Sequence, residues 1–180
     1  MPTGSYNENM RNDIRFGVIL VVLAASGGVG ASPLAPPVSV KTIADLPTPL
    51  PYPYDEQADA HAALNAAFAR ARANGKRVLI DFGGNWCGDC RVLAGIMELP
   101  EVKTFITQHY DVVTIDVGRY TRNMDIAAQF GLGKLAGGVP EILVAEANGK
   151  LINVSNAADL EDARHMTPQA LADWLARWAR

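Results

Sequence analysis

The stretch VLIDFGGNWCGDC, residues 78–90, places the two cysteines of the chain, Cys87 and Cys90, directly behind a short apolar run. Residues 77–83 have the aliphatic composition of a buried strand, and Asp81 interrupts them. A helix is expected to begin at about Cys87. The cysteine pair therefore lies where a strand gives way to a helix.

Three uses of this cysteine pair are weighed: a metal site, a structural disulfide and a redox couple. A structural zinc site takes four ligands, usually as two pairs. Here one CxxC stands alone, and the histidines, His61, His109 and His165, lie in different expected elements. A disulfide that closes a loop over two residues removes little entropy from the unfolded chain. Metal binding and a purely structural role are therefore the weaker interpretations.

The redox interpretation has positive support from the position of the pair. At a helix N-terminus, free N–H groups and the helix dipole favour an anion, so a thiolate is stabilised there. The thiolate is the nucleophile in disulfide exchange. Cys90, one helical turn beyond Cys87, is placed to attack the resulting mixed disulfide and release the partner.

The rest of the chain alternates between helical and strand patterns. Strands separated by helices favour a parallel pair with helices on both faces, and a hairpin adds antiparallel strands. The sequence therefore predicts an α/β fold with a central mixed sheet of about four strands. The expected elements are helix 55–75, strand 77–83, helix 87–99, helix 100–110, strand 111–117, helix 123–131, a hairpin of strands 141–145 and 150–154, and helix 167–178.

The first 31 residues have the pattern of a secretory signal peptide. Two arginines precede a ten-residue apolar run, residues 16–25, and Val29 and Ala31 occupy the −3 and −1 places of a cleavage site. A transmembrane helix takes roughly 20 apolar residues, and this run is shorter and ends in glycines. An uncleaved anchor is therefore the weaker alternative. We expect an extracytoplasmic location, in a periplasm or tethered to the membrane.

Residues 32–53 contain seven of the 11 prolines of the chain. Such a segment forms neither regular helix nor central strand, so residues 32–54 are predicted to be an extended linker. The folded domain is expected to span residues 55–180.

Composition limits the functional class. The chain has 180 residues, 49% of them hydrophobic, which suits one domain with an ordinary core. Its net charge is −3 and it has no run of basic residues, so nucleic-acid binding has little support. Two cysteines are too few to replace a core with disulfides.

Residues 76–155 resemble the thioredoxin superfamily. The similarity rests on Asp81, six residues before the first cysteine, on Trp86 just before it, and on GGVPEILV, residues 137–144. Over residues 55–180 the chain looks most like exported bacterial thioredoxin-like proteins. The resemblance implies a thioredoxin-like fold with helices on both faces of the sheet and a thiol–disulfide oxidoreductase site.

The resemblance also implies roles for three residues of this stretch. Cys87 would be the attacking thiolate and Cys90 the buried resolving thiol. Asp81 would be a buried carboxyl that exchanges a proton with Cys90 through water, because desolvation raises the pKa of an aspartate toward the range useful for acid–base work. The alternative for Asp81 is a solvated aspartate that faces an edge.

The substrate-facing residues are implied in the same way. Trp86 would shield the sulfur, although ordinary packing explains a tryptophan there as well. Pro140, in cis, would bring the backbone of Val139 beside Cys87, where it could pair with an extended substrate peptide.

The chain departs from thioredoxin between its cysteines, where Gly88 and Asp89 replace the usual Gly-Pro. A carboxylate close to Cys87 disfavours the thiolate, so we expect Asp89 to raise the pKa of Cys87 and to make the couple more reducing. The alternative is that Asp89 only caps the helix and faces water. The segment before Pro140, residues 131–139, is also longer than is usual in the family.

The predicted function is that of an exported thiol–disulfide oxidoreductase that reduces disulfides of other extracytoplasmic proteins. It would need no cofactor or metal beyond the Cys87–Cys90 disulfide. Because a bacterial periplasm is kept oxidising, a reductase there would draw on a membrane-borne electron donor. The alternatives are a disulfide oxidase or isomerase of the same fold and a non-catalytic binding module.

Overall fold

A computed structural model describes residues 32–135 and 137–180, so the predicted signal peptide lies outside the described residues. Three strands form the sheet, in the order β2–β1–β3. β1 (Arg77–Gly83) lies between β2 (Tyr110–Asp116), to which it is parallel, and β3 (Glu141–Ala145), to which it is antiparallel. The mixed sheet predicted from the sequence is confirmed.

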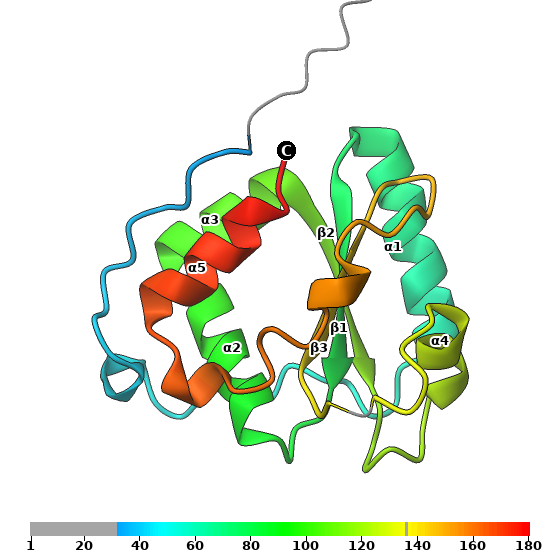
Figure 1. Ribbon diagram of the computed structural model, residues 1–180, viewed down its shortest axis with the longest axis horizontal. Helices are drawn as coiled ribbons and strands as arrows, with labels where there is room; N and C mark the ends of the chain where they lie inside the picture. Colours follow the sequence, from blue (N-terminus) through cyan, green and yellow to red (C-terminus); the bar gives the residue numbers. More distant parts are fainter. Residues whose placement is uncertain (1–31, 136) are drawn as a thin grey trace, which may run out of the picture.

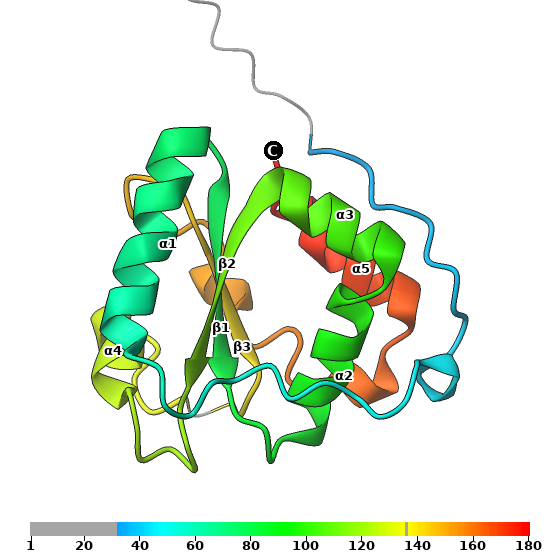
Figure 2. The same cartoon turned by 180° about the vertical axis from the view of Figure 1, so that it is seen from behind.

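Helices cover both faces of this sheet (Figures 1 and 2). α1 (Ala60–Asn74) and α4 (Met124–Gln129) lie on one face. α2 (Gly88–Met97), α3 (Pro100–His109) and α5 (Pro168–Arg177) lie on the other. Each face has its own apolar core. None of the helices within residues 32–135 and 137–180 is long and apolar enough to cross a membrane.

The helix ends follow local sequence signals. Asp59 accepts a hydrogen bond from the backbone N–H of Ala62 at the start of α1, and Gly75 ends this helix with a φ of 78°. Thr167 caps α5 in the same way, by accepting from the N–H of Ala170. Such caps satisfy backbone groups that the helix itself leaves unpaired.

The expected fourth strand, residues 150–154, is wrong. Within the described residues its only strand pairing is a bridge between Leu151 and Ala145. Beyond it the buried side chain of Asn153 takes the place of a strand: its Oδ1 accepts from the N–H of Val144 at 2.7 Å, and its Nδ2 donates to the carbonyl of Ile142 at 2.8 Å. One side chain thus satisfies two backbone groups at the free edge of β3, and the carbonyl of Ala157 accepts from the N–H of Ile142 at 2.8 Å.

The proline-rich segment runs extended around the outside of α2, α3 and α5 and then crosses below the sheet to α1 (Figures 1 and 2). It is part of the packing: Val38, Leu46 and Tyr54 are buried, the first two in the core that faces α2, α3 and α5. The sequence predicted an extended linker here and did not predict that its side chains would be buried in the core. The proposed domain boundary at residue 55 stays a prediction.

Candidate active site

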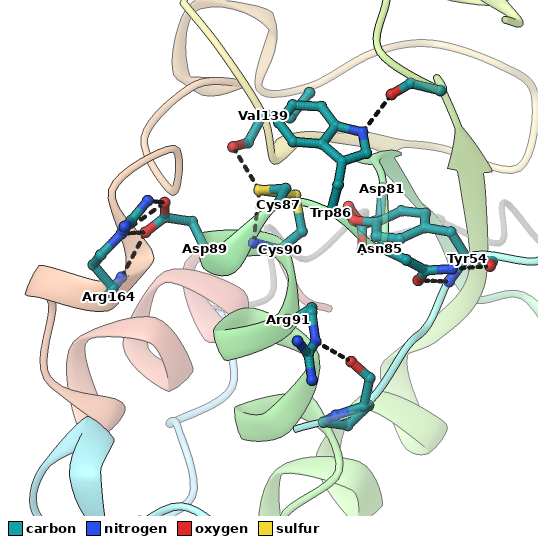
Figure 3. Close-up of a disulfide and its surroundings, with 12 residues drawn as sticks. Tyr54, Asp81, Asn85, Trp86, Cys87, Asp89, Cys90, Arg91, Val139 and Arg164 are labelled. Atoms are coloured by element: carbon teal, nitrogen blue, oxygen red, sulfur yellow. Dashed lines mark hydrogen bonds and ion pairs between the residues drawn. A yellow bond between two sulfur atoms is a disulfide. The ribbon is translucent and has the colours of Figure 1, made fainter. Parts of the chain in front are cut away.

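The two cysteines are joined as a disulfide at the start of α2, with their Cα atoms 5.3 Å apart (Figure 3). Cys87 is the N-cap residue of the helix, and its Sγ accepts from the backbone N–H of Cys90 at 3.1 Å. Cys90 is completely buried, whereas Cys87 keeps a small exposed area. The backbone N–H of Cys90 therefore points at the sulfur of Cys87, where it would stabilise a thiolate.

Val139 closes the site from the opposite side. Its carbonyl oxygen lies 3.2 Å from Cys87 Sγ, and the Val139–Pro140 peptide bond is cis. Pro140 directly precedes β3, so the sheet holds the Val139 backbone against the cysteine. The structure thus brings Cys87, Val139 and Pro140 together from segments about fifty residues apart.

Asp81 lies in the central strand with 2% of its surface exposed, which excludes the alternative of a solvated aspartate at an edge. Burial raises its pKa to about 7, although a hydrogen bond from Tyr54 acts in the opposite direction. The Tyr54 hydroxyl donates to Asp81 Oδ1 at 2.8 Å. A carboxyl with a pKa near neutrality is suited to accept and return a proton at physiological pH.

Trp86 lies beside the disulfide with 40% of its surface exposed (Figure 3). Its indole N–H donates to the carbonyl of Gly118, and its ring meets that of Tyr120 edge-to-face with centroids 5.9 Å apart. The guanidinium of Arg119 lies 4.9 Å from the centre of the indole. The loop after β2 thus holds the ring in place, and shielding of the sulfur by Trp86 stays a prediction.

Asp89 does not face water, so the alternative of a solvated helix cap is excluded. It is 4% exposed, and Arg164 contacts both of its carboxylate oxygens: Nε lies 3.0 Å from each, and Nη2 forms an ion pair with Oδ2 (Figure 3). The backbone N–H of Arg164 donates to it as well, at 2.9 Å. Burial opposes ionisation of Asp89, but the hydrogen bonds and charge of Arg164 outweigh it and lower the pKa of this carboxyl.

Sequence reasoning missed two residues of the site, Tyr54 and Arg164. Tyr54 lies at the end of the proline-rich segment. Because that segment was interpreted as a linker, its tyrosine was not expected to be buried. Arg164 follows Asp89 by 75 residues and belongs to a short 3₁₀ turn, Ala163–His165. Neither carries a local signal, because both act across contacts that only the fold creates.

No group of three or more histidine, cysteine, aspartate or glutamate side chains that could hold a metal ion occurs within residues 32–135 and 137–180. His61 and His165, both exposed, pair with Asp125 and Asp162 at the surface. The side chains that the structure brings together at the site include the cysteine pair and the neighbouring carboxyl of Asp81.

The chain is similar to known proteins in sequence and fold. The profile of a family described as thioredoxin-like matches residues 59–147. A disulphide isomerase from Xylella fastidiosa Temecula1, a solved structure, is 34% identical and superimposes with a TM-score of 0.67 over 71% of this chain and 97% of that one. The chain belongs to the thioredoxin superfamily.

Two curated thioredoxin-like relatives match over shorter stretches. A thioredoxin from Alicyclobacillus acidocaldarius is 35% identical over 68 residues, 38% of this chain and 60% of the relative. The thioredoxin-like protein slr0233 of Synechocystis is 38% identical over 60 residues, 33% of this chain and 52% of the relative. The matched stretches thus span between half and two thirds of these two relatives.

Proposed function

We propose that this thioredoxin-like protein is a thiol–disulfide oxidoreductase that reduces disulfides in other extracytoplasmic proteins. The observation that carries the proposal is the place of Cys87, which caps α2 with its sulfur 3.2 Å from the Val139 carbonyl. An extended peptide that paired with the Val139 backbone would present its own sulfur to Cys87.

The reduction would proceed in two exchanges. The Cys87 thiolate attacks one sulfur of the substrate disulfide, forms a mixed disulfide and releases the other substrate sulfur as a thiolate, which takes a proton from water. Cys90 then gives its proton to Asp81 and attacks Cys87 Sγ. The bond to the substrate breaks, its electron pair leaves on the substrate sulfur, and the Cys87–Cys90 disulfide forms. Two electrons pass to the substrate, and a dithiol donor must restore the enzyme.

The charges near Cys87 favour the reducing direction. Strongly oxidising thiol–disulfide oxidoreductases owe their high reduction potential to an unusually stabilised thiolate. Here Arg164, a basic side chain beside the first turn of α2, is neutralised by Asp89. The thiolate would therefore gain little from this guanidinium, which suits a reductase better than an oxidase.

Isomerisation is the second candidate. The solved Xylella fastidiosa structure, of which the match covers 97%, is that of a protein named as a disulphide isomerase. The two functions share the first exchange and differ in the fate of the mixed disulfide. An isomerase would reactivate scrambled ribonuclease without net consumption of a reductant, whereas a reductase would consume a reductant in proportion to the disulfides cleaved.

The proposal is tested by reduction of insulin with dithiothreitol, in which the wild type is compared with Cys87→Ser and Cys90→Ser. We expect acceleration by the wild type alone and a trapped mixed disulfide with Cys90→Ser. Equal rates for the wild type and Cys87→Ser would instead indicate a binding module without catalysis. The redox potential of the pair then distinguishes a reductase from an oxidase.

The extracytoplasmic location and the membrane-borne donor are part of the same proposal. Their support is the signal-peptide pattern of residues 1–31 and the need of a reductase in an oxidising compartment for a source of electrons. Fusion of residues 1–31 to an alkaline phosphatase that folds only after export tests the first point. An inactive fusion retained in the cytoplasm would contradict it.

A further inference from the structure

The end of the proline-rich segment, residues 50–54, is fastened to the active-site loop by Asn85, and we call these five residues the strap. The backbone N–H of Tyr54 donates to Asn85 Oδ1 at 3.1 Å, and Asn85 Nδ2 donates back to the carbonyl of Tyr54 at 2.8 Å (Figure 3). One amide side chain thus pairs with the strap backbone as a neighbouring strand would.

A second fastening comes from Arg91, the residue after Cys90. Its Nε donates to the carbonyl of Pro51 at 3.1 Å and its Nη2 to that of Leu50 at 2.8 Å. The same guanidinium lies 4.0 Å from the centre of the Tyr52 ring. The strap is therefore held by residues on both sides of the cysteine pair.

The strap so held places one hydroxyl group inside the redox site. Tyr54 is 3% exposed, and its hydroxyl donates to Asp81. A Cβ atom built on Gly83 would lie 2.2 Å from this hydroxyl oxygen and 2.8 Å from Cys90 Sγ. Those two atoms are thus separated by at most the sum of these distances, and glycine at position 83 leaves the space in which they approach.

Asp81 has a second side, away from the hydroxyl. It lines a cavity of about 270 Å³ together with the prolines of the strap and with residues of α2 and β2. This volume is large enough to admit water. A proton taken from Cys90 would therefore have a route from Asp81 to solvent beneath the strap.

Other ionisable groups near this carboxyl are Glu98 at the end of α2 and Asp116 on β2. Basic side chains neutralise both: Lys103 Nζ lies 2.6 Å from Glu98, and Arg122 Nη2 lies 2.7 Å from Asp116. Glu141 on β3 is paired in register with Phe82, so its side chain lies on the opposite face of the sheet from Asp81. Tyr54 is thus the side chain that donates directly to Asp81 in the part of the chain described.

We propose that the strap is a functional part of the redox site and that Tyr54 is a positioning residue, whose hydroxyl holds Asp81 as the carboxylate that accepts the proton of Cys90. This inference deepens the proposed function and rests on its second exchange. The hydroxyl itself forms and breaks no bond in the reaction.

The direction of the effect is set by the hydrogen bond. A donor to a carboxylate stabilises the charged form, so Tyr54 lowers the pKa that burial raises to about 7. Hydrogen bonds to charged groups are strong enough to move such a pKa by about one unit. Removal of the hydroxyl should therefore leave Asp81 protonated, and unable to accept a proton, up to a higher pH.

The test uses Ellman's reagent with the reduced protein. Attack by Cys87 releases one thionitrobenzoate, and attack by Cys90 on the mixed disulfide releases a second. For Tyr54→Phe we expect the pH midpoint of the second phase to rise by about one unit and its rate at pH 7 to fall roughly fivefold. Tyr52→Phe, which removes an exposed hydroxyl from the same strap, is the matched control and should behave as the wild type.

Two further variants keep the outcome decisive. Asp81→Asn should remove the part of the pH dependence of the second phase that titrates near pH 7, and Tyr54→Phe added to it should change nothing more. Asn85→Ala, which releases the strap but keeps the tyrosine, should shift the midpoint in the same direction. Unchanged midpoints in both Tyr54→Phe and Asn85→Ala, or an equal shift in Tyr52→Phe, would overturn the inference.

A direct titration separates this inference from the proposed function. Carbon-13 NMR of the Asp81 carboxyl in the oxidised protein should show a higher midpoint in Tyr54→Phe than in the wild type. This result does not depend on any protein substrate. Loss of insulin reduction with the Tyr54 effect intact would refute the proposed function alone, and insulin reduction without the Tyr54 effect would refute the inference alone.

Discussion

At the scale of single residues, Asp89 owes its chemistry to a partner 75 residues away. In the sequence it is an isolated carboxylate beside a thiolate, which would disfavour ionisation of Cys87. In the structure the guanidinium of Arg164 lies against it, so the two charges largely cancel. The expected effect of Asp89 on Cys87 stays a prediction, now with a counter-charge included.

Single and double substitutions separate these two charges. Asp89→Asn leaves Arg164 unopposed and should lower the midpoint of Cys87 thiolate formation by about half a unit to one unit. Arg164→Gln should raise it, and the double variant should return close to the wild type. Ultraviolet absorbance of the thiolate against pH measures all three. A midpoint that rises in Asp89→Asn would contradict the electrostatic account.

The raised pKa of Asp81 leads to a prediction about how stability depends on pH. Its pKa is raised to about 7 in the folded protein from an ordinary value of 3.8, so the folded state binds more protons than the unfolded state between these values. The stability that this difference contributes is fully present below pH 3.8 and is lost as the pH rises to about 7. The free energy of unfolding should fall by about 3–4 kcal/mol across this window.

Urea denaturation of the oxidised protein between pH 4 and 8 measures this slope. Asp81→Asn cannot ionise and should lack this part of the pH dependence, so it should exceed the wild type in stability above pH 7. Equal slopes for the two proteins would show that Asp81 is not protonated near neutrality.

At the scale of elements, the free edge of β3 is paired with a side chain, that of Asn153, where a fourth strand was expected. The predicted hairpin is confirmed at its turn, where the N–H of Glu146 donates to the carbonyl of Lys150 at 2.8 Å. The second strand fails because Asn153 supplies one donor and one acceptor to the edge of β3. A turn signal followed by apolar residues cannot distinguish a second strand from a segment whose side chain bonds to the strand edge.

Asn153→Ala should therefore destabilise the protein by about 2–3 kcal/mol, because it leaves a buried N–H and a buried carbonyl of β3 without partners. Chemical denaturation gives the difference. Asn156→Ala, a truncation of an amide that bonds only to exposed groups nearby, is the control and should change the stability by less than about 0.5 kcal/mol. Equal effects of the two substitutions would show that Asn153 does not replace a strand.

At the scale of the whole molecule, the proline-rich segment is a third layer over the helices of one face. Leu46 is 4% exposed in the core that α2, α3 and α5 share, whereas Leu34 in the same segment is 92% exposed. The two leucines therefore report whether the segment packs as the structure shows or behaves as a linker.

Leu46→Ala should reduce the free energy of unfolding by about 2–4 kcal/mol, and Leu34→Ala should leave it within about 0.5 kcal/mol of the wild type. Thermal and urea denaturation of both variants make the comparison. If neither substitution changed the free energy of unfolding, residues 32–54 would behave as a linker and not as part of the core.

The sequence by itself determined the order of the helices and of the strands β1, β2 and β3, the central strand at residues 77–83 and the place of the cysteine pair at the start of a helix. Each of these rests on local signals: apolar runs, capping residues, and glycine or proline at the ends of elements. Asp81, Trp86 and Pro140 are singled out by the resemblance to the thioredoxin superfamily, through short motifs that lie within or beside those elements.

The tertiary structure alone decided the pairing of Asp89 with Arg164, the hydroxyl that Tyr54 brings to Asp81 and the replacement of a strand by Asn153. All three are hydrogen bonds made by side chains, and two of them join segments far apart in the chain. Their strength comes from burial, which removes competing water, and burial is a property of the packed fold that no local pattern expresses.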